Sequence, residues 1–401
     1  MIAHKNLRRF LLIPGLILGL VFPTTANAAP KLVTIKSAVK WGESADIELF
    51  TVTNKAVVTV KNITNSTSNI EIQARDFAGA NLWSKLIDSG SDEVASAITA
   101  DNQGNIWIAG NSAIPASAET ATAVGPALNP DNVAVEKVSP LRQDMRQLTL
   151  WKINIAGEVA DTFASLQSEI SLVDAISVSA TGISVIGVRE TGAFLISADL
   201  KGVFGKELKI GTAKTKINAV VRLGDGTVNL FGSSTETLAG KNLVGREDGV
   251  LIKVSKAGAI SSVVRSSAPR AQRSWTSATS NLFLTGSVKS GTTSESAITK
   301  FTSSFAPTWT TRVASTGSTL ASTGPNNSFY AVLEPTSAVK GLAPAKLAKG
   351  QSIVLQFDSK GLLVNAFTAA ELGKVKSTGF SAGGGLFLLT DSGIFRVGAT
   401  K

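Results

Sequence analysis

Short apolar segments recur seven times along this chain, and each is followed by a partner segment of alternating pattern. The first members of these pairs are apolar runs such as residues 56–60, 105–109 and 227–231. The second members, such as residues 69–73 and 249–253, alternate apolar with polar side chains. That alternation is the period of a β-strand with one buried face. The pattern therefore predicts an all-β protein built from one repeated unit.

Turns that contain glycine follow most of the second segments, for example at Gly157, Gly202 and Gly361. Glycine supplies the positive φ angle that a short hairpin requires, so we expect a third strand after each turn. A fourth, more polar segment, such as residues 93–98, then leads into the next copy. The copies recur about every 45 to 55 residues, which is the period of a β-propeller blade. We expect the first, apolar segment of each copy to be the innermost strand of its blade. A β-helix is the alternative, but its rungs are shorter and more regular.

The two ends of the repeat complement each other. The last copy stops after its second strand, whereas residues 32–36 and 47–51 near the start have the pattern of a third and a fourth strand. Pairing these ends in one blade would close the ring and cover strand edges that promote aggregation. We therefore predict a seven-bladed β-propeller with a two-plus-two strand closure between its ends, with six or eight blades as alternative counts.

The start of the chain predicts export. Residues 1–9 are basic, residues 10–22 form an apolar run, and Ala28 completes the small-x-small pattern that a signal peptidase recognises. The apolar run is shorter than a membrane-spanning helix requires. We expect residues 1–28 to be a signal peptide and residues 29–401 to be a single propeller domain. Its expected location is the medium, the cell wall or the periplasm.

Histidine and cysteine provide no chemistry in the expected mature chain. The sequence has no cysteine, and its one histidine, His4, lies in the expected signal peptide. Thiol nucleophiles, imidazole bases and the usual zinc ligands are therefore excluded. No spacing of Asp or Asn identifies a metal site, so we expect no cofactor. Ca²⁺ stays the open alternative, because Asp and backbone carbonyl oxygens are compatible with it.

Three classes of function stay open on this basis. The leading interpretation is a non-catalytic binding scaffold. The second is a carbohydrate-active hydrolase or lyase that uses carboxylates alone, although no spacing in the sequence picks out a carboxylate pair. The third is a structural component of the cell envelope that associates with itself.

Residues 100–110 (Ala-Asp-Asn-Gln-Gly-Asn-Ile-Trp-Ile-Ala-Gly) resemble the start of a blade in bacterial exported β-propeller repeat proteins. Residues 223–232 are a shorter form of that pattern, and residues 246–254 resemble the second strand of the same repeat. The resemblance implies the fold and export but no particular chemistry. The three aspartates of these segments are expected to form turns: Asp101, Asp225 and Asp248. Antibiotic-linearising lyases built on propellers depend on histidine, which the expected mature chain lacks.

The longest connections predict the binding face. Loops between the first and second strands of a blade emerge on the same face as loops between the third and fourth, and binding residues concentrate on such loops. The long connections are residues 111–147, a long insertion with four prolines, and residues 233–248, 287–295 and 334–351. The residues expected to bind a partner are Arg142, Arg146, Lys241, Arg246, Arg265, Arg270, Arg273, Trp275, Lys340 and Lys346.

Charge suggests what this face binds. The formal net charge of the whole chain is +10, and it falls to +7 without the three cations of residues 1–28 (Lys5, Arg8 and Arg9). Because the long connections are basic on balance, we expect an anionic partner: a cell-envelope polymer, an acidic polysaccharide or a protein. Nucleic acid is disfavoured, since these loops lack interleaved aromatic residues for base stacking. The tryptophans near strands are expected to pack between blades: Trp41, Trp83, Trp151 and Trp309.

Overall fold

Twenty-eight β-strands and one 3₁₀ turn, η1 (Pro325–Asn327), make up the regular structure of the computed structural model, which describes residues 32–114, 142 and 144–398. The expected signal peptide and most of the 111–147 connection lie outside the described residues. Within the described part of the chain, no helix has the length and apolar character needed to cross a membrane.

Five sheets contain four antiparallel strands each. The first contains β3 (Leu49–Val52), β4 (Ala56–Thr64), β5 (Ser68–Asp76) and β6 (Asn81–Ile87). The second contains β7 (Glu93–Ala100), β8 (Ile106–Ser112), β9 (Gln147–Ile153) and β10 (Val159–Leu166). The third contains β11 (Leu172–Ser179), β12 (Gly182–Arg189), β13 (Gly192–Ala198) and β14 (Leu208–Ile210). The fourth contains β15 (Thr215–Arg222), β16 (Val228–Ser234), β17 (Asp248–Val254) and β18 (Ile260–Ser266). The fifth combines β2 (Val39–Gly42) with β26 (Val375–Ser381), β27 (Gly385–Thr390) and β28 (Ile394–Val397).

The sixth sheet has eight strands because one long strand pairs on both sides. β22 (Pro307–Thr323) pairs with β21 (Thr293–Phe301) along its first half and with β23 (Phe329–Pro335) along its second half. Beyond β21 the sheet continues through β20 (Phe283–Ser290) to β19 (Gln272–Ala278). Beyond β23 it continues through β24 (Ile353–Phe357) and β25 (Leu363–Thr368) to β1 (Ile35–Ser37), which pairs in parallel.

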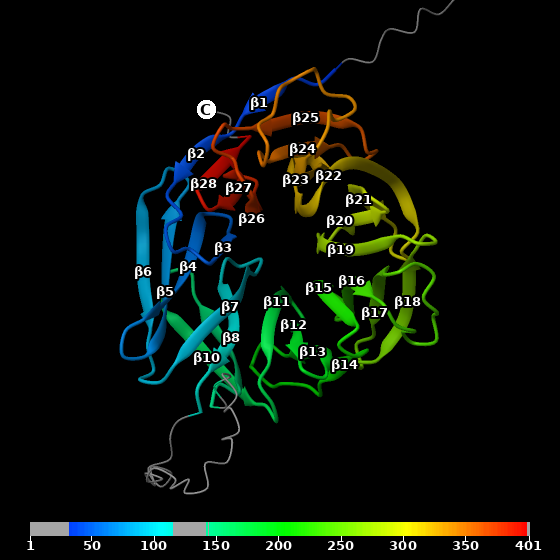
Figure 1. Cartoon of the computed structure of the whole chain (residues 1–401). Helices are drawn as coiled ribbons and strands as arrows, with labels where there is room; N and C mark the ends of the chain where they lie inside the picture. The colour runs from blue at the N-terminus through cyan, green and yellow to red at the C-terminus, as the bar shows by residue number, and fades with distance from the viewer. Residues whose placement is uncertain (1–31, 115–141, 143, 399–401) are drawn as a thin grey trace, which may run out of the picture. The chain divides into compact units, whose positions relative to one another are not determined.

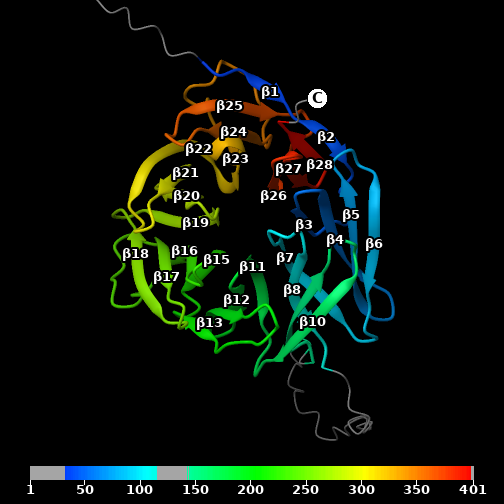
Figure 2. The same cartoon turned by 180° about the vertical axis from the view of Figure 1, so that it is seen from behind.

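These sheets surround a common centre (Figures 1 and 2). The strands nearest the centre contact one another in chain order, in the sequence β3, β7, β11, β15, β19, β22 and β26. β26 in turn contacts β3, so the ring is closed. The protein is therefore a β-propeller, as the repeat predicted.

The predicted count of seven separate blades is wrong, as are the alternatives of six and eight. The described residues form five four-stranded blades, and the remainder of the ring is the continuous eight-stranded sheet. The reason lies in residues 315–319, where β22 passes through a register shift rather than a turn. Hydrogen bonding consequently runs unbroken from one ladder into the next, and the repeat boundary expected there does not separate two sheets.

The predicted two-plus-two closure is also wrong. The closing sheet contains three C-terminal strands and one N-terminal strand, because β2 pairs with β28 alone. Residues 32–36, expected to join the closing blade, lead into β1, which extends the eight-stranded sheet. Residues 47–51, expected to join it too, overlap β3, the inner strand of the first sheet. Figures 1 and 2 both show β1 and β2 along the outer rim beside β25 and β28.

The order of strands within each blade is shifted by one from the prediction. The most apolar segments, expected to be innermost, form the second strands from the centre, such as β8 and β16. Every residue of β8 and of β16 is buried, because a strand on each side and a sheet on each face cover them. The strands predicted to be fourth and more polar, such as β7, lie nearest the centre and bury alternate residues. The most apolar segments therefore lie in the middle of each sheet rather than at its inner edge.

Aromatic side chains join neighbouring parts of the ring. The indole of Trp41 donates to the Phe77 carbonyl at 2.9 Å, and that of Trp83 donates to the Ile155 carbonyl at 3.2 Å. Each bond joins one sheet to a turn of the next. Trp151 is buried among residues of the first and second sheets, and Trp309 donates to the Ser359 carbonyl at 3.2 Å within the eight-stranded sheet. These tryptophans hold the ring together.

Candidate binding site: a basic cavity between two sheets

Two connections that carry expected binding residues pair with each other. The β16–β17 connection and the β18–β19 connection are joined by the Arg246 amide, which donates to the Ala271 carbonyl at 2.8 Å. The Arg273 amide donates to the Glu247 carbonyl at 2.9 Å. Because β19 begins the eight-stranded sheet, this backbone pairing joins that sheet to the fourth sheet. It also gathers six of the ten expected binding residues on adjoining segments: Lys241, Arg246, Arg265, Arg270, Arg273 and Trp275.

A buried ion pair fixes the shape of these connections. The Arg265 guanidinium lies 3.2 Å from the Asp248 carboxylate, which is fully buried. Arg265 also donates to the Lys241 carbonyl at 3.1 Å and to the Glu236 carbonyl. Burial alone would raise the pKa of Asp248, but hydrogen bonds from the amides of Val244 and Gly245 and from the Arg265 guanidinium outweigh it and hold that pKa below its usual range. Arg265 therefore serves the loop structure, and Asp248 is more than the turn former that was expected.

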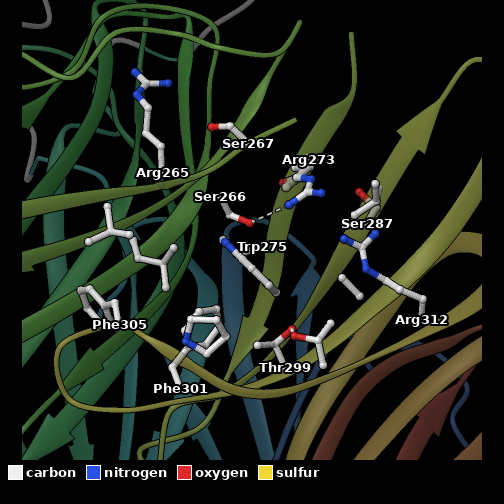
Figure 3. Close-up of a pocket in the computed structure, with 17 residues that line it drawn as sticks. Arg265, Ser266, Ser267, Arg273, Trp275, Ser287, Thr299, Phe301, Phe305 and Arg312 are labelled. Atoms are coloured by element: carbon white, nitrogen blue, oxygen red, sulfur yellow. Dashed lines mark hydrogen bonds between the residues drawn. The ribbon is translucent and has the colours of Figure 1, made fainter. Parts of the chain in front are cut away.

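A cavity of about 310 Å³ lies between the fourth sheet and the eight-stranded sheet (Figure 3). Its apolar wall contains Leu251, Val264, Val288, Phe301 and Phe305, together with the ring of Trp275. Its polar wall contains the arginines Arg265, Arg273 and Arg312 and the hydroxyl residues Ser266, Ser267, Ser274, Ser287, Thr299 and Thr310. In Figure 3, Arg273 and Arg312 lie on one side, the two phenylalanines lie on the other, and Trp275 stands between them.

Two nitrogen donors of this cavity have no partner among the described residues. Trp275 is only 5% exposed, and its Nε1 has no partner among the described residues. The same holds for Nε of Arg273, whose Nη1 donates to Ser266 Oγ at 3.2 Å. A buried donor without a partner costs about 1–3 kcal/mol, so native structures rarely leave one unexplained. Both donors suit a ligand that is rich in acceptor atoms.

Arg312 adds a second guanidinium to the same wall. Its Nη1 lies 3.5 Å from a Glu295 carboxylate oxygen, and its side chain is 31% exposed. Burial and then the nearby charge of Arg273 lower the pKa of Arg312, whereas Glu295 raises it. Two arginines that share a partly buried wall repel each other, and a bound anion would relieve that repulsion.

The remaining expected binding residues lie elsewhere in the ring. Arg142 is 2.8 Å from Asp92 and also pairs with Asp144, so two carboxylates already match its charge. The Ser68 amide and then Arg142 lower the pKa of Asp92. Arg146 precedes β9 and is partly buried. Lys340 and Lys346 are exposed on the connection between β23 and β24. The ten residues therefore do not form one patch, and three of them line the cavity: Arg265, Arg273 and Trp275.

Sequence reasoning missed Arg312, Phe301 and Phe305. The expected binding residues were sought mainly on loops. Arg312 lies on β22, Phe301 lies on β21, and Phe305 lies in the turn between these strands. Residues 287–295, expected to be a long loop, instead extend β20 and β21 up to a two-residue turn. The available signal was the alternation of residues 308–312, which places Arg312 on one face of a strand.

A second cavity, of about 450 Å³, lies between the third and fourth sheets. Of the residues that the structure describes, one with a carboxyl group lines it: Asp174, whose pKa is raised by burial. Its other polar residues are Thr215, Lys216 and Asn218. Glycoside hydrolysis by carboxylates needs a pair of them about 5–10 Å apart. Within the described part of the chain, no cluster of three or more His, Cys, Asp or Glu side chains could hold a metal ion.

No family model and no curated protein matches the chain. Among solved structures it is similar to a streptogramin B lyase, with 9% identity and a TM-score of 0.50 over 89% of this chain and 96% of that one. It is also similar to the Dos1 propeller, with 10% identity and a TM-score of 0.49 over 90% and 94% of the two chains. Virginiamycin B lyase from Staphylococcus aureus gives 8% identity and a TM-score of 0.48 over 89% and 96%. At such identities the likeness to the streptogramin B lyase concerns the fold alone.

Proposed function

We propose that this protein is an exported, non-catalytic β-propeller that binds an anionic partner at the cavity between its fourth and eight-stranded sheets. The observation that supports this function is the convergence of Arg273, Arg312 and the unpartnered Trp275 Nε1 in one cavity. The expected partner is a cell-envelope polymer, an acidic polysaccharide or an acidic protein, because each presents anionic groups to such a wall.

The rigidity of the surroundings favours binding over catalysis. The loops beside the cavity are fixed by the Arg265–Asp248 pair and by backbone bonds between the two connections. Among the described residues, none with a carboxyl group lines this cavity, and one lines the second cavity. A carboxylate-only enzyme would need a pair. A rigid scaffold with preset donors instead lowers the entropic cost of binding.

The test is binding of purified residues 29–401 to isolated envelope polymers and acidic polysaccharides across a salt titration. We expect binding that weakens with salt and is lost in a variant that combines Arg273→Ala with Arg312→Ala. The control is Lys360→Ala, which removes an exposed cation of the β24–β25 turn that does not line the cavity. Retained binding in the double variant would exclude the cavity, and equal losses in the control would indicate a general charge effect.

A further inference from the structure

The cavity is divided into an apolar half and a polar half, which restricts its ligand further. Phe301 is 5% exposed and Phe305 is 4% exposed, and their rings continue the apolar surface of Trp275. Arg273 and Arg312 lie across from them (Figure 3). A volume of about 310 Å³ is at the lower end of the range for small-molecule pockets. The space therefore suits one small group rather than a length of polymer.

The charges of the polar half call for a single negative charge. Arg265 is already paired with Asp248. Of the described residues, Glu295 is the one that forms an ion pair with either of the other two arginines. One positive charge on this wall thus has no counterpart. A monoanion would balance it, whereas a dianion would leave an uncompensated negative charge in a partly buried space.

The polar wall offers more free hydrogen-bond donors than acceptors. Ser266 Oγ accepts from Arg273 and Ser274 Oγ accepts from Asn218, so the proton of each hydroxyl is free to point elsewhere. Trp275 Nε1 and Arg273 Nε have no acceptor among the described residues. A carboxylate offers about four lone-pair sites in a small volume, and arginine binds it in a planar, two-point geometry.

We propose that the cavity binds a monocarboxylate with an apolar, ring-sized body. The carboxylate lies between Arg273 and Arg312 and accepts from the Trp275 indole, and the body packs against Phe301 and Phe305. This inference rests on the proposed function, because it assumes that the cavity is the anion-binding site. The acid is either a free small molecule or a pendant group of a larger partner, and the chemistry recognised is the same.

The experiment uses isothermal titration calorimetry of residues 29–401 with four probes. Phenylacetate has a carboxylate and an apolar ring. Benzyl alcohol has the ring without the charge, glucuronate has a carboxylate on a polar ring, and inorganic phosphate is an anion without a ring. We expect phenylacetate to bind more tightly than the other three. We also expect Arg273→Ala and Arg312→Ala to weaken its binding about 10-fold or more each, with Lys360→Ala unchanged.

A second readout locates the ligand. Phenylacetate should shift the indole N–H signal in the nuclear magnetic resonance spectrum that disappears in Trp275→Phe. Tighter binding of glucuronate or phosphate, lost in Arg273→Ala, would overturn this inference while the proposed function stands. Absence of binding by all three anions would overturn both. Should an arginine variant fail to fold, the ranking of the four probes on the unaltered protein still decides between these results.

Discussion

At the scale of single residues, the Arg265–Asp248 pair shows how a charge can be buried at the edge of a binding site. The Arg265 side chain is 7% exposed and that of Asp248 is fully buried. Two amides and a guanidinium surround the carboxylate, so its desolvation is offset by donors fixed in the loop. The pair thereby holds the β16–β17 connection against β18 and leaves Arg273 and Arg312 to face the cavity.

Removing one member of this pair should destabilise the fold. We expect Arg265→Ala to lower the free energy of unfolding by about 3–5 kcal/mol, because Asp248 then stays buried without its counter-charge. Urea denaturation followed by circular dichroism measures this change. The double variant Arg265→Ala with Asp248→Ala should lose less than the sum of the two single variants. Additive losses would show that the two side chains are not coupled.

The same carboxylate should make stability depend on acid pH. The pKa of Asp248 is lower in the folded chain than in the unfolded chain. Its contribution is therefore present above the unfolded value of about 3.8 and is lost as the pH falls through the folded value. We expect Asp248→Asn to be less stable than wild type near neutral pH, with the gap narrowing below about pH 4. A gap that stays constant across that range, measured by urea denaturation, would contradict this assignment.

At the scale of elements, a glycine turn beneath an aromatic ring recurs around the propeller. A Cβ atom on Gly157 would lie 2.5 Å from the Trp83 ring, and one on Gly361 would lie 2.5 Å from the Trp309 ring. Both glycines also have positive φ angles, which alanine adopts only with strain. Glycine in these turns therefore meets two requirements. It adopts the positive φ angle of the hairpin, and it leaves space for an aromatic ring from an outer strand.

A matched pair of substitutions separates these two requirements. Gly157 and Gly258 close equivalent turns at φ +86° and +78°, but nothing lies within 4 Å of a Cβ atom on Gly258. Both Gly→Ala changes incur the backbone cost, whereas Gly157→Ala must also displace Trp83. We expect Gly157→Ala to be more destabilising than Gly258→Ala by about 1–3 kcal/mol. Thermal unfolding of the two variants measures the difference, and equal losses would mean that the ring contact contributes nothing.

The elements also show what a sequence of this kind can reveal. Apolar alternation and glycine turns located the strands and the propeller, because they reflect local backbone and burial requirements. They did not show that residues 315–319 shift register without a turn, since that depends on pairing between distant strands. Arg273 and Trp275 were identified because they lie near a basic connection. Arg312 was missed because it lies on a strand. The packing of two sheets brings it to the cavity, and a search limited to loops does not find it.

At the scale of the whole molecule, the N-terminal strands link the two ends of the ring. β2 covers the edge of β28, and Trp41, within β2, reaches the Phe77 carbonyl of the first sheet. The Trp41 ring also packs edge-on against Phe387 of β27, at 5.3 Å between centroids. β1 covers the edge of β25 in the same way. Without these strands, two edges would present unpaired backbone groups.

Two truncations should differ in their effect. Removing residues 1–37 deletes β1 alone, whereas removing residues 1–42 also deletes β2 and Trp41. We expect the shorter truncation to stay monodisperse with a modestly lower melting temperature. The longer one should melt earlier and form larger species through the exposed β28 edge. Size-exclusion chromatography with light scattering, together with thermal unfolding, compares them. Equal melting temperatures and equal particle sizes for the two truncations would show that β2 contributes nothing to the stability of the closed ring.

The pairing of β2 with β28 also has a consequence for how the protein is made. A ribosome that adds about 5–20 residues per second would complete β28 roughly 20 to 70 seconds after β2. Throughout that interval β2 has no partner strand. Completing the first four sheets does not end this period, because β28 belongs to the fifth. The pairing that joins the two ends of the ring therefore forms only after β28 has been synthesised.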